Sequence, residues 1–528
     1  MIFIPSPLSG VMPRYFALSA IIHADEVVCN PAADGMIEGT RRGSYNRIDI
    51  VLFIMLEYAA MENSLVKRYI GDRAFYRRAS TVILPIILQN VVTNFVSLLD
   101  NIMVGQTGTA SMSGVAVVGQ MFFVFYLFVF GTVSGPGIFC AQFWGAGQER
   151  PFKAAFRYKF VTAMAVCLVC MAVIGLFGRS LIGLYLTGGE AERQEVMTYA
   201  LGYLRIMLWG MIPYTISMIY SSTLREEGRT LVPMIASWAA VAVNLALNWV
   251  LIFGKLGAPA MGVRGAAAAT VVSRLCEMSV CAAWSHLHRD KVLFTRRMLE
   301  GCPMDRRLLR SLAVKSVPLM LNEGLWCLGT ATLMQIYSTR GIRVMAALNI
   351  GYVLMDLFNA VSFSVGTTIG IIVGQELGAG ETEKAVDTDR KLLALGLAVG
   401  LTLCLAGLLC AEAFPRFYNT SGEVRALAAA LIRVMSCVLP VECFAHGCYF
   451  TMRSGGKTAV TFLFDSGFSW AVNVPVAFLA ARFTSMGVVA LYAVSSYTVL
   501  LKCVIGGVMV HRRYWVNNLA AEQAASEL

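Results

Sequence analysis

The sequence predicts an all-α polytopic membrane protein with twelve transmembrane helices in two parallel six-helix halves. Hydrophobic residues make up 57% of the 528 residues and charged residues 14%, and the mean hydropathy is +0.66. Soluble proteins are about 45–50% apolar and about 25% charged, so this composition excludes a soluble fold. The apolar residues form recurrent runs near the ~20 residues that a helix needs to cross a bilayer. An internal repeat divides these runs into two sets of six.

The first 64 residues differ from the rest, because they carry scattered prolines and charges and no apolar run of spanning length. We expect residues 1–64 to form an N-terminal extension that is disordered or lies upstream of the natural start. The apolar runs that follow are too long and too continuous for the ~10-residue alternating strands of a transmembrane barrel. The predicted helices lie at residues 79–104, 112–141, 155–178, 200–224, 231–254, 263–287, 309–339, 344–374, 388–412, 424–452, 458–482 and 486–511.

Lysine and arginine concentrate in alternate connections between these helices, most densely at residues 67–78 and 288–310. Because positive residues stay in the cytoplasm, we expect both termini and the 288–310 connection to be cytoplasmic, in a cell inner membrane. These loops also account for the net charge of +11, so no nucleic-acid partner is expected. The predicted organisation is a first half at 65–287, a basic linker at 288–308, a second half at 309–512 and a tail at 513–528.

The repeat is visible in loop motifs that recur in the same order in both halves. Residues 137–157 read GIFCAQFWGAGQERPFKAAFR and residues 370–390 read GIIVGQELGAGETEKAVDTDR, which share G-I-x3-Q-x2-G-A-G-x9-R at an offset of 233. Residues 223–230 and 451–458 match at an offset of 228. Six helices per half is an even number, so both halves enter the membrane in the same direction, as parallel repeats do. Two such halves suit alternating access, with the substrate bound between them.

The Q-x2-G-A-G segments are predicted to be rigid cytoplasmic corners without buried chemistry. Glycine allows tight turns, and glutamine side chains can cap helix ends. The residues concerned are Gln142, Gly145, Gly147, Gln375, Gly378 and Gly380.

These motifs resemble the MATE family (multidrug and toxic compound extrusion), in particular its prokaryotic members. The resemblance covers about residues 65–512. It implies a V-shaped twelve-helix fold and secondary active export, in which entry of Na⁺ or H⁺ drives efflux of drugs, mostly organic cations. The segments that carry it are Pro85–Gly105 in the first helix, the two Q-x2-G-A-G loops, Asn244–Gly254 in the fifth helix and Thr451–Thr458 after the tenth.

Acids inside the predicted helices are the candidates for ion coupling, because a charge in hydrocarbon costs roughly 2.5–3.5 kcal/mol on insertion scales. Asp100 matches the family's first-helix aspartate. Asn244 and Asn248 share one helix face, since they are four residues apart, and they match its fifth-helix pair. Many relatives carry aspartate at the second position, so Asn248 leaves one negative charge fewer. The alternative for the pair is packing through interhelical hydrogen bonds.

The second half offers further acids. Glu442 matches the position of a cation-binding acid on the tenth helix of some family members. Glu323 lies on the seventh helix, where relatives often carry a glutamate. His446 and Asp356 are weaker candidates. A coupling Na⁺ is expected at Asp100, Asn244 and Asn248 or at Glu323 and Glu442. Two acids are expected to serve structure instead: Asp465 paired with Arg453 or Lys457, and Glu277 paired with Arg274.

The sequence thus predicts a monomeric, cation-coupled multidrug exporter that confers drug resistance. It is not expected to be an enzyme or to hold a cofactor; no G-x4-G-K-[ST] phosphate loop is present. Its partners are small-molecule drugs and the lipid bilayer. Two alternatives remain open: a flippase for a lipid-linked precursor, which would want basic residues in its cavity, and a membrane receptor that does not transport.

Overall fold

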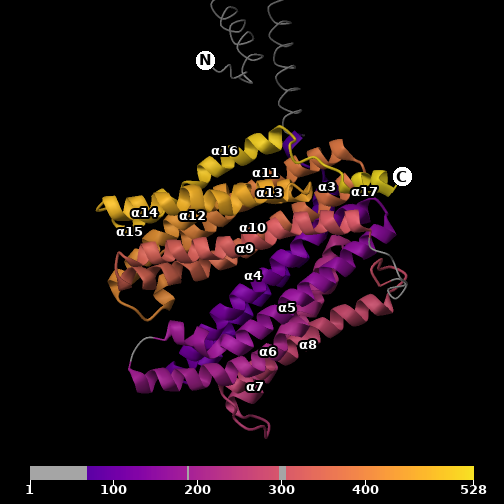
Figure 1. Ribbon diagram of the computed structural model, residues 1–528. Helices are drawn as coiled ribbons and strands as arrows, with labels where there is room; N and C mark the ends of the chain where they lie inside the picture. The colour runs from indigo at the N-terminus through magenta and orange to yellow at the C-terminus, as the bar shows by residue number, and fades with distance from the viewer. Residues whose placement is uncertain (1–67, 187–188, 296–304, 528) are drawn as a thin grey trace, which may run out of the picture. The chain divides into compact units, whose positions relative to one another are not determined.

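The computed structural model describes residues 68–186, 189–295 and 305–527 (Figure 1). The predicted N-terminal extension and residues 296–304 of the basic linker lie outside these ranges. Ten helices in the described ranges are long and apolar enough to cross a membrane. Two more, α6 and α9, run alongside them at comparable length. Both helices carry polar and small residues in their central turns, such as Pro213, Tyr214 and Thr215 in α6 and Asn322, Glu323 and Gly324 in α9, which lowers their mean hydropathy.

The first half consists of six helices, of which the first four extend beyond the predicted apolar limits into polar turns, most clearly α6. Helices α7 and α8 match the predicted ranges to within one residue. The described helices of this half are α3 (Arg73–Gly105), α4 (Thr109–Gly145), α5 (Glu149–Tyr185), α6 (Glu190–Glu226), α7 (Leu231–Phe253) and α8 (Val263–Leu287).

The second half repeats this order, and its last two spans, residues 458–483 and 488–511, depart locally from regular α-helical geometry. The sequence predicts continuous helices at 458–482 and 486–511; the first contains π-helical turns and the second breaks at Tyr497–Thr498. The described elements are α9 (Arg306–Ser338), α10 (Ile342–Gly378), α11 (Thr382–Cys410), η2 (Phe414–Phe417), α12 (Gly422–Ser454), α13 (Thr458–Phe462), η3 (Leu463–Gly467), η4 (Ser469–Asn473), α14 (Val474–Phe483), α15 (Val488–Ser496) and α16 (Val499–His511).

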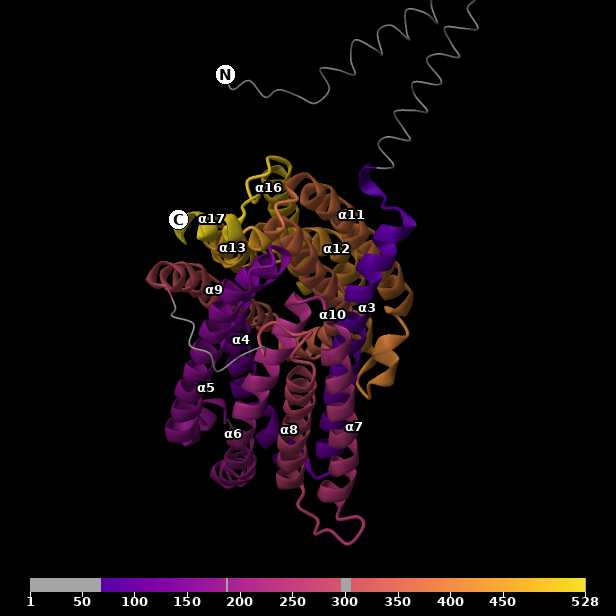
Figure 2. The same ribbon diagram turned by 90° about the vertical axis from the view of Figure 1, so that its right-hand side faces the viewer.

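The two halves meet where α3 and α4 pack against α9 and α10 (Figure 2). Helix α3 contacts α7 of its own half and α10 of the other, so it lies at the boundary between the halves. The apolar cores follow the same division. One core joins α4–α8 to the start of α9, and another joins the start of α3 to α10–α12. A carboxylate on α3 is thus placed where a change in one half can reach the other.

Both Q-x2-G-A-G turns lie at one end of the bundle, which we call the paired-turn end. Gly147 and Gly380 have left-handed backbones, with φ of 67° and 80°. The residue after each glycine donates its backbone N–H to a carbonyl five residues earlier, Phe143 or Glu376, at 2.9 and 3.0 Å. This pattern ends a helix with an abrupt change of direction.

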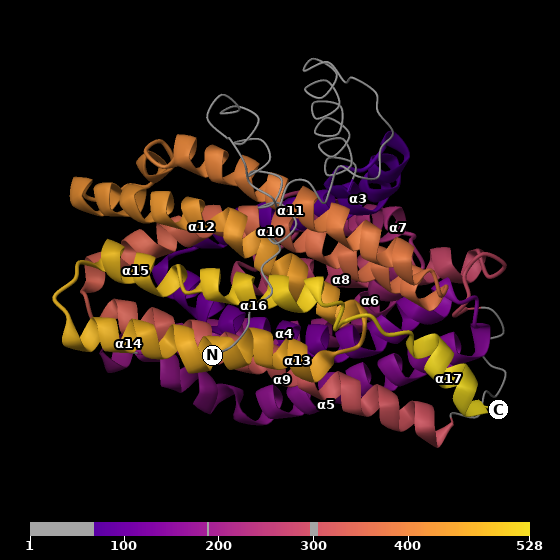
Figure 3. The ribbon, with the colours of Figure 1, turned by 90° about the horizontal axis from the view of Figure 1, so that it is seen from above.

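A short helix, α17 (Leu519–Glu527), occupies part of the predicted tail and was not anticipated. It lies at the paired-turn end, beside the first turns of α9 (Figures 1 and 3). Leu519 and Ala520 are buried in the first-half core, while Trp515, just before the helix, is buried in the core of the second half. The segment from Trp515 to Glu527 therefore packs on both halves.

Candidate functional sites

Asp100 lies among polar side chains from three helices of the first half. Asn244 and Asn248, one turn apart on α7, both face its carboxylate, as their spacing predicts. The Nδ2 of Asn248 donates to Oδ1 of Asp100 at 2.6 Å and to Oδ1 of Asn244 at 3.1 Å. Thr270 of α8 lies 3.5 Å from Nδ2 of Asn244. Asn248 is 0% exposed, so these contacts lie inside the protein.

The amide of Asn244 cannot satisfy both neighbours while Asp100 is ionised. With its oxygen toward Asp100, that oxygen lies 2.7 and 3.1 Å from two carboxylate oxygens. With the amide reversed, its nitrogen donates to Asp100 but faces the donating Nδ2 of Asn248 at 3.1 Å. Two acceptors or two donors therefore meet in either orientation. A proton on Asp100, or a cation between the oxygens, removes the conflict.

A chain of hydrogen bonds extends the polar interior of the first half toward the paired-turn end. Arg274 and Glu277 of α8 form an ion pair at 2.9 Å, which confirms the predicted pairing. Glu277 accepts from Ser237 at 2.6 Å, and Ser237 accepts from Gln89 of α3 at 2.6 Å. Gln89 in turn accepts from Arg225 of α6 at 2.7 Å. Each link joins a different pair of helices, so the side chains fix how these helices pack.

The acids of the second half do not form an equivalent cluster. Glu323 of α9 lies against Gly131 of α4, at the boundary between the halves. Glu442 of α12 and Asp356 of α10 form no ion pair within the described ranges, and Asp356 is exposed. His446 has a buried Nδ1 without a hydrogen-bond partner in the same ranges. The structure therefore brings the first-half candidates into hydrogen-bond contact, whereas Glu323, Glu442 and His446 lie around Asp465 and Lys502, whose charges act on them.

Asp465 pairs with Lys502, and the expected pairing with Arg453 or Lys457 is wrong. The Nζ of Lys502, on α16, lies 2.6 Å from Oδ1 of Asp465, and Nδ2 of Asn322 donates to Oδ2 at 3.0 Å. Asp465 sits in the π-helical turn η3, which turns its carboxylate toward α9 and α16 instead of the loop after α12. Lys502 was missed although it is the only lysine in its apolar run, a signal strong enough to have found it.

The paired-turn end is closed by matching contacts between the halves. The Nε2 of Gln142 donates to the carbonyl oxygen of Ser454 at 2.8 Å, and Nε2 of Gln375 donates to that of Glu226 at 2.7 Å. Both glutamines cap helix ends, as expected, but the ends belong to the opposite half. Gly145 approaches the carbonyl of Gln375 and Gly378 that of Gln142 so closely that a Cβ would overlap it.

The C-terminal segment also contributes hydrogen bonds to the paired-turn end. The backbone N–H of Leu519 donates to Oε1 of Gln142 at 2.7 Å, and Nε2 of Gln142 also lies 3.2 Å from the carbonyl of Asn517. Gln148 donates to the carbonyl of Ala520 at 3.2 Å. The amide of Gln142 is therefore shared between the opposite half and the tail.

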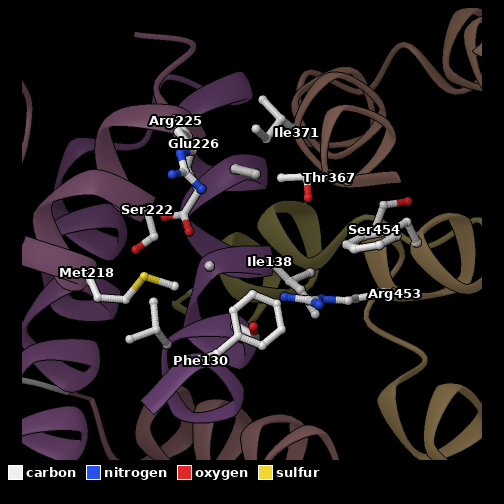
Figure 4. Close-up of a pocket in the computed structure, with 16 residues that line it drawn as sticks. Phe130, Ile138, Met218, Ser222, Arg225, Glu226, Thr367, Ile371, Arg453 and Ser454 are labelled. Carbon is white, nitrogen blue, oxygen red and sulfur yellow. The ribbon is translucent and has the colours of Figure 1, made fainter. Parts of the chain in front are cut away.

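A cavity lies between the halves near this end, lined by α4, α6, α10 and α12 (Figure 4). It contains about 620 Å³ of empty space, including its open part. Its charged lining residues are Arg225, Glu226 and Arg453. Glu226 is paired with Lys159 of α5, whose Nζ lies 2.6 and 2.9 Å from its two oxygens. Lys159 is 0% exposed, so the charge of Glu226 is balanced by a buried lysine and Glu226 is not a free acid.

Glu227, just after α6, is buried against the connection that follows α8. Burial raises its pKa to about 7, although the backbone N–H of Leu293 donates to it at 3.1 Å and Arg229 lies 3.4 Å away. Those partners favour the charged form but do not offset the loss of water.

Comparisons with known proteins agree with this architecture. The MatE family model matches residues 85–250 and 318–479, one segment in each half. "Probable multidrug resistance protein YoeA" of Bacillus subtilis (strain 168) is 24% identical over 432 residues, covering 82% of this chain and 92% of that protein. "Probable multidrug resistance protein NorM" of Thermotoga maritima is 23% identical over 435 residues, covering 82% and 91%.

Solved structures match the same part of the chain. "Crystal structure of MATE in the straight conformation" superposes with a TM-score of 0.76 at 17% identity, covering 85% of this chain and 97% of that one. "Outward-facing conformation of a multidrug resistance MATE family transporter of the MOP superfamily" gives 0.73 at 18% identity, covering 85% and 98%. These matches confirm the predicted two-half, twelve-helix fold. Because the family model covers more than half of the sequence and matches in both halves, this chain belongs to the MatE family, whose members are multidrug efflux transporters and not enzymes.

Proposed function

We propose that this protein exports organic, mostly cationic drugs by exchanging them for a cation, through alternating access of its two halves. Family membership supports transport, and the printed names of the relatives support drugs as the cargo. The arrangement around Asp100 supports coupling, because a half-buried carboxylate without an ion-pair partner in the described ranges can take up and release a cation.

We assign coupling to H⁺ at Asp100. A proton on Oδ1 of Asp100 would donate to Oδ1 of Asn244, 2.7 Å away, while the same Oδ1 still accepts from Asn248. The bond from Asn248 to Asn244 stays intact, so one proton satisfies all three side chains. A Na⁺ ion would instead need several oxygen ligands, and Asn248 turns its nitrogen toward the carboxylate. This one hydrogen-bond conflict carries the assignment.

The proposed transport cycle follows from the change in charge of Asp100. Proton uptake from outside would neutralise Asp100, add a hydrogen bond to Asn244 of α7 and favour release of a cationic drug. Reciprocal linkage requires drug and proton to oppose one another in binding to the same extent. Glu323 and Glu442 are the proposed acids of the second half, with Asp356 and His446 as lesser candidates. Na⁺ exchange at Asp100, Asn244 and Asn248 or at Glu323 and Glu442 is the alternative.

We propose that the paired-turn end faces the cytoplasm, with both termini on that side of the cell inner membrane, and that the transporter is a monomer. The concentration of Lys and Arg in the connections at this end supports the orientation. In this orientation the contacts of Gln142 and Gln375 close the cytoplasmic side.

Efflux of a fluorescent cation from proteoliposomes, with pH and Na⁺ gradients imposed separately, tests the function. We expect the pH gradient to drive efflux and the Na⁺ gradient to leave it unchanged. Asp100→Asn should insert and fold but lose gradient-driven efflux, while Glu423→Gln, an exposed acid paired with Arg343, should keep it. Full efflux by well-expressed Asp100→Asn would remove this residue from the mechanism.

A second part of this experiment tests which residue determines the coupling ion. Asn248→Asp adds the carboxylate that many relatives carry at this position, and we expect it to make efflux respond to a Na⁺ gradient. If the Asn248→Asp protein stays insensitive to Na⁺, the missing charge is not what sets the ion.

A flippase for a lipid-linked precursor is the second candidate. It would favour basic residues in its cavity, and the lining by Arg225 and Arg453 speaks for it. Translocation of a lipid-linked pyrophosphate in vesicles, without efflux of the fluorescent cation, would favour the flippase.

A further inference from the structure

We propose that the segment from Trp515 to Gln523, which we call the C-terminal strap, restrains the transporter and must release from the first half before the paired-turn end opens. The strap thereby sets how often the molecule reaches the state that is open at this end. The inference rests on alternating access in the proposed function and adds a regulatory element to it. None of the strap residues lines the cavity between the halves.

The strap is anchored to the second half at its start. Trp515 is 1% exposed and belongs to the core that joins the start of α3 to α10–α12. Its carbonyl lies so close to Gly455 that a Cβ at Gly455 would overlap it. Gly455 has a φ of −83°, which any residue adopts, and the repeat places Glu227 at the equivalent position of the first half, at the offset of 228. Glycine at 455 is therefore explained by the close passage of the strap backbone.

Four residues later the strap is anchored to the first half. Leu519 and Ala520 are buried in the first-half core, and Gln523 is buried one turn farther along α17. The backbone N–H of Leu519 donates to Oε1 of Gln142 at 2.7 Å, and Nε2 of Gln148 donates to the carbonyl oxygen of Ala520 at 3.2 Å. These two glutamines lie in the last turn of α4 and just before α5. One face of α17 thus holds the first half through apolar burial and hydrogen bonds.

The connection between the two anchors is short. Trp515 and Leu519 are four residues apart, and four fully extended residues span at most about 14 Å. A larger separation of the anchors requires one of them to leave its site. Trp515 buries a larger apolar side chain than Leu519 or Ala520, and the stabilisation from burial increases with apolar area. The anchor on the first half is therefore the one that releases.

The strap also occupies the boundary between the halves. Leu519 lies next to Gly456 of the second half, where an added Cβ would come within 2.9 Å of its Cδ1. The Nε2 of Gln142 donates to the carbonyl of Ser454 at 2.8 Å and also lies 3.2 Å from that of Asn517. The side chain that joins the halves is thus the same one that holds the strap. Opening at the paired-turn end has to break both sets of contacts together.

Spin labels on the turns after α4 and α10 test the inference in phosphatidylcholine nanodiscs without any ion gradient. Leu519→Glu puts a charge at a buried apolar position, and we expect it to raise the open-to-closed ratio at least tenfold. Ala521→Glu adds the same charge on the exposed face of α17 and should leave the ratio unchanged. An unchanged ratio in folded Leu519→Glu, or an equal rise in both variants, would overturn the proposal.

A shortened variant that ends at Asn518 covers the case in which Leu519→Glu does not fold. It lacks the first-half anchor but keeps Trp515, and it should show the same rise. Hydrogen exchange gives a reading on the unchanged protein. The N–H of Leu519 should exchange at least tenfold more slowly than in an unstructured peptide of the same sequence, because it bonds to Gln142. Exchange at the unstructured rate would contradict a docked strap.

Failure of the strap and failure of the export function are distinguishable. The variant that ends at Asn518 should open at the paired-turn end without any gradient or drug, so this result does not depend on transport. Absence of efflux for every dye, with opening that still responds to loss of the strap, would contradict export alone. Gradient-driven efflux in the unchanged protein, with opening that does not respond to loss of the strap, would contradict the strap alone.

Discussion

The side-chain amide of Gln142 donates to the carbonyl oxygen of Ser454 at 2.8 Å, across the boundary between the two halves. The repeat supplies the reciprocal contact, from Gln375 to the carbonyl of Glu226. Any separation of the halves at the paired-turn end has to break both hydrogen bonds. The two glutamines therefore bias the transporter toward the state that is closed at this end.

Gln142→Ala combined with Gln375→Ala should raise the population open at the paired-turn end. A hydrogen bond contributes about 1 kcal/mol, so losing two shifts the open-to-closed ratio by roughly thirtyfold. Distances between spin labels on the turns after α4 and α10 measure the shift. Gln120→Ala, an exposed glutamine on α4, is the control. An unchanged distance distribution in the double variant would show that apolar packing alone holds this end shut.

Gly145→Ala should prevent the same closure by a different route, because its Cβ would overlap the carbonyl of Gln375. Two backbones cannot yield as a flexible side chain can, so we expect a loss of several kcal/mol, within the range seen for overpacking. Thermal unfolding and the spin-label distances both report it. Gly119→Ala has open space around its Cβ and should leave both unchanged. Normal stability of Gly145→Ala would mean that the turns separate at little cost.

Trp515→Ala should destabilise the protein by about 3–5 kcal/mol, as expected for deleting a buried tryptophan. Trp515 is 1% exposed, whereas its neighbour Tyr514 is 53% exposed. Tyr514→Ala should therefore cost less than about 1 kcal/mol. Denaturation in detergent compares the two variants. Similar losses for both would indicate that the tail does not pack as described.

Glu227 should make stability fall as pH rises from about 4.5 to about 7. Its pKa is higher in the folded protein, about 7, than in the unfolded chain, 4.5. The folded state then binds more protons in this window, and the free energy of unfolding declines with pH. A shift of this size corresponds to about 3 kcal/mol at most. The decline ends above pH 7, where both states are ionised.

Glu227→Gln tests this sign directly. The variant should have a flatter profile of unfolding temperature against pH between 4.5 and 7 than the unchanged protein. Glu423→Gln, an exposed acid, should retain the original slope. An identical slope in Glu227→Gln would assign the dependence to another group.

Local pattern and the repeat predicted much of the fold and the position of Asn244 and Asn248 beside Asp100. The offset of 233 between the loop motifs identified the halves, and a spacing of four residues placed Asn244 and Asn248 on one face toward Asp100. Both inferences use neighbours along the chain or a single helix. The contacts from Gln142 to Ser454 and from Asp465 to Lys502 depend on how separate helices are placed, which periodicity does not encode. The position of Arg225 and Arg453 in one cavity likewise depends on how separate helices are placed.

The geometry of one span shows a second limit of sequence analysis. Apolar composition predicted the helix at 458–482, but not the π-helical turns η3 and η4 that widen it around Asp465. A π-helical turn arises when a side chain must reach a partner that regular spacing would miss, and such turns are frequent at functional positions. The partner, Lys502, lies 37 residues farther along the chain.

The seating of Trp515 and α17 has a practical consequence for studying this molecule. A reporter protein or affinity tag fused after the last residue would be attached to a segment that packs on both halves. Such a tag would interfere with the relative motion of the halves that a transport assay is meant to measure. The turn between α7 and α8, at residues 254–262, lies at the far end of its helices and offers a neutral place for such a label.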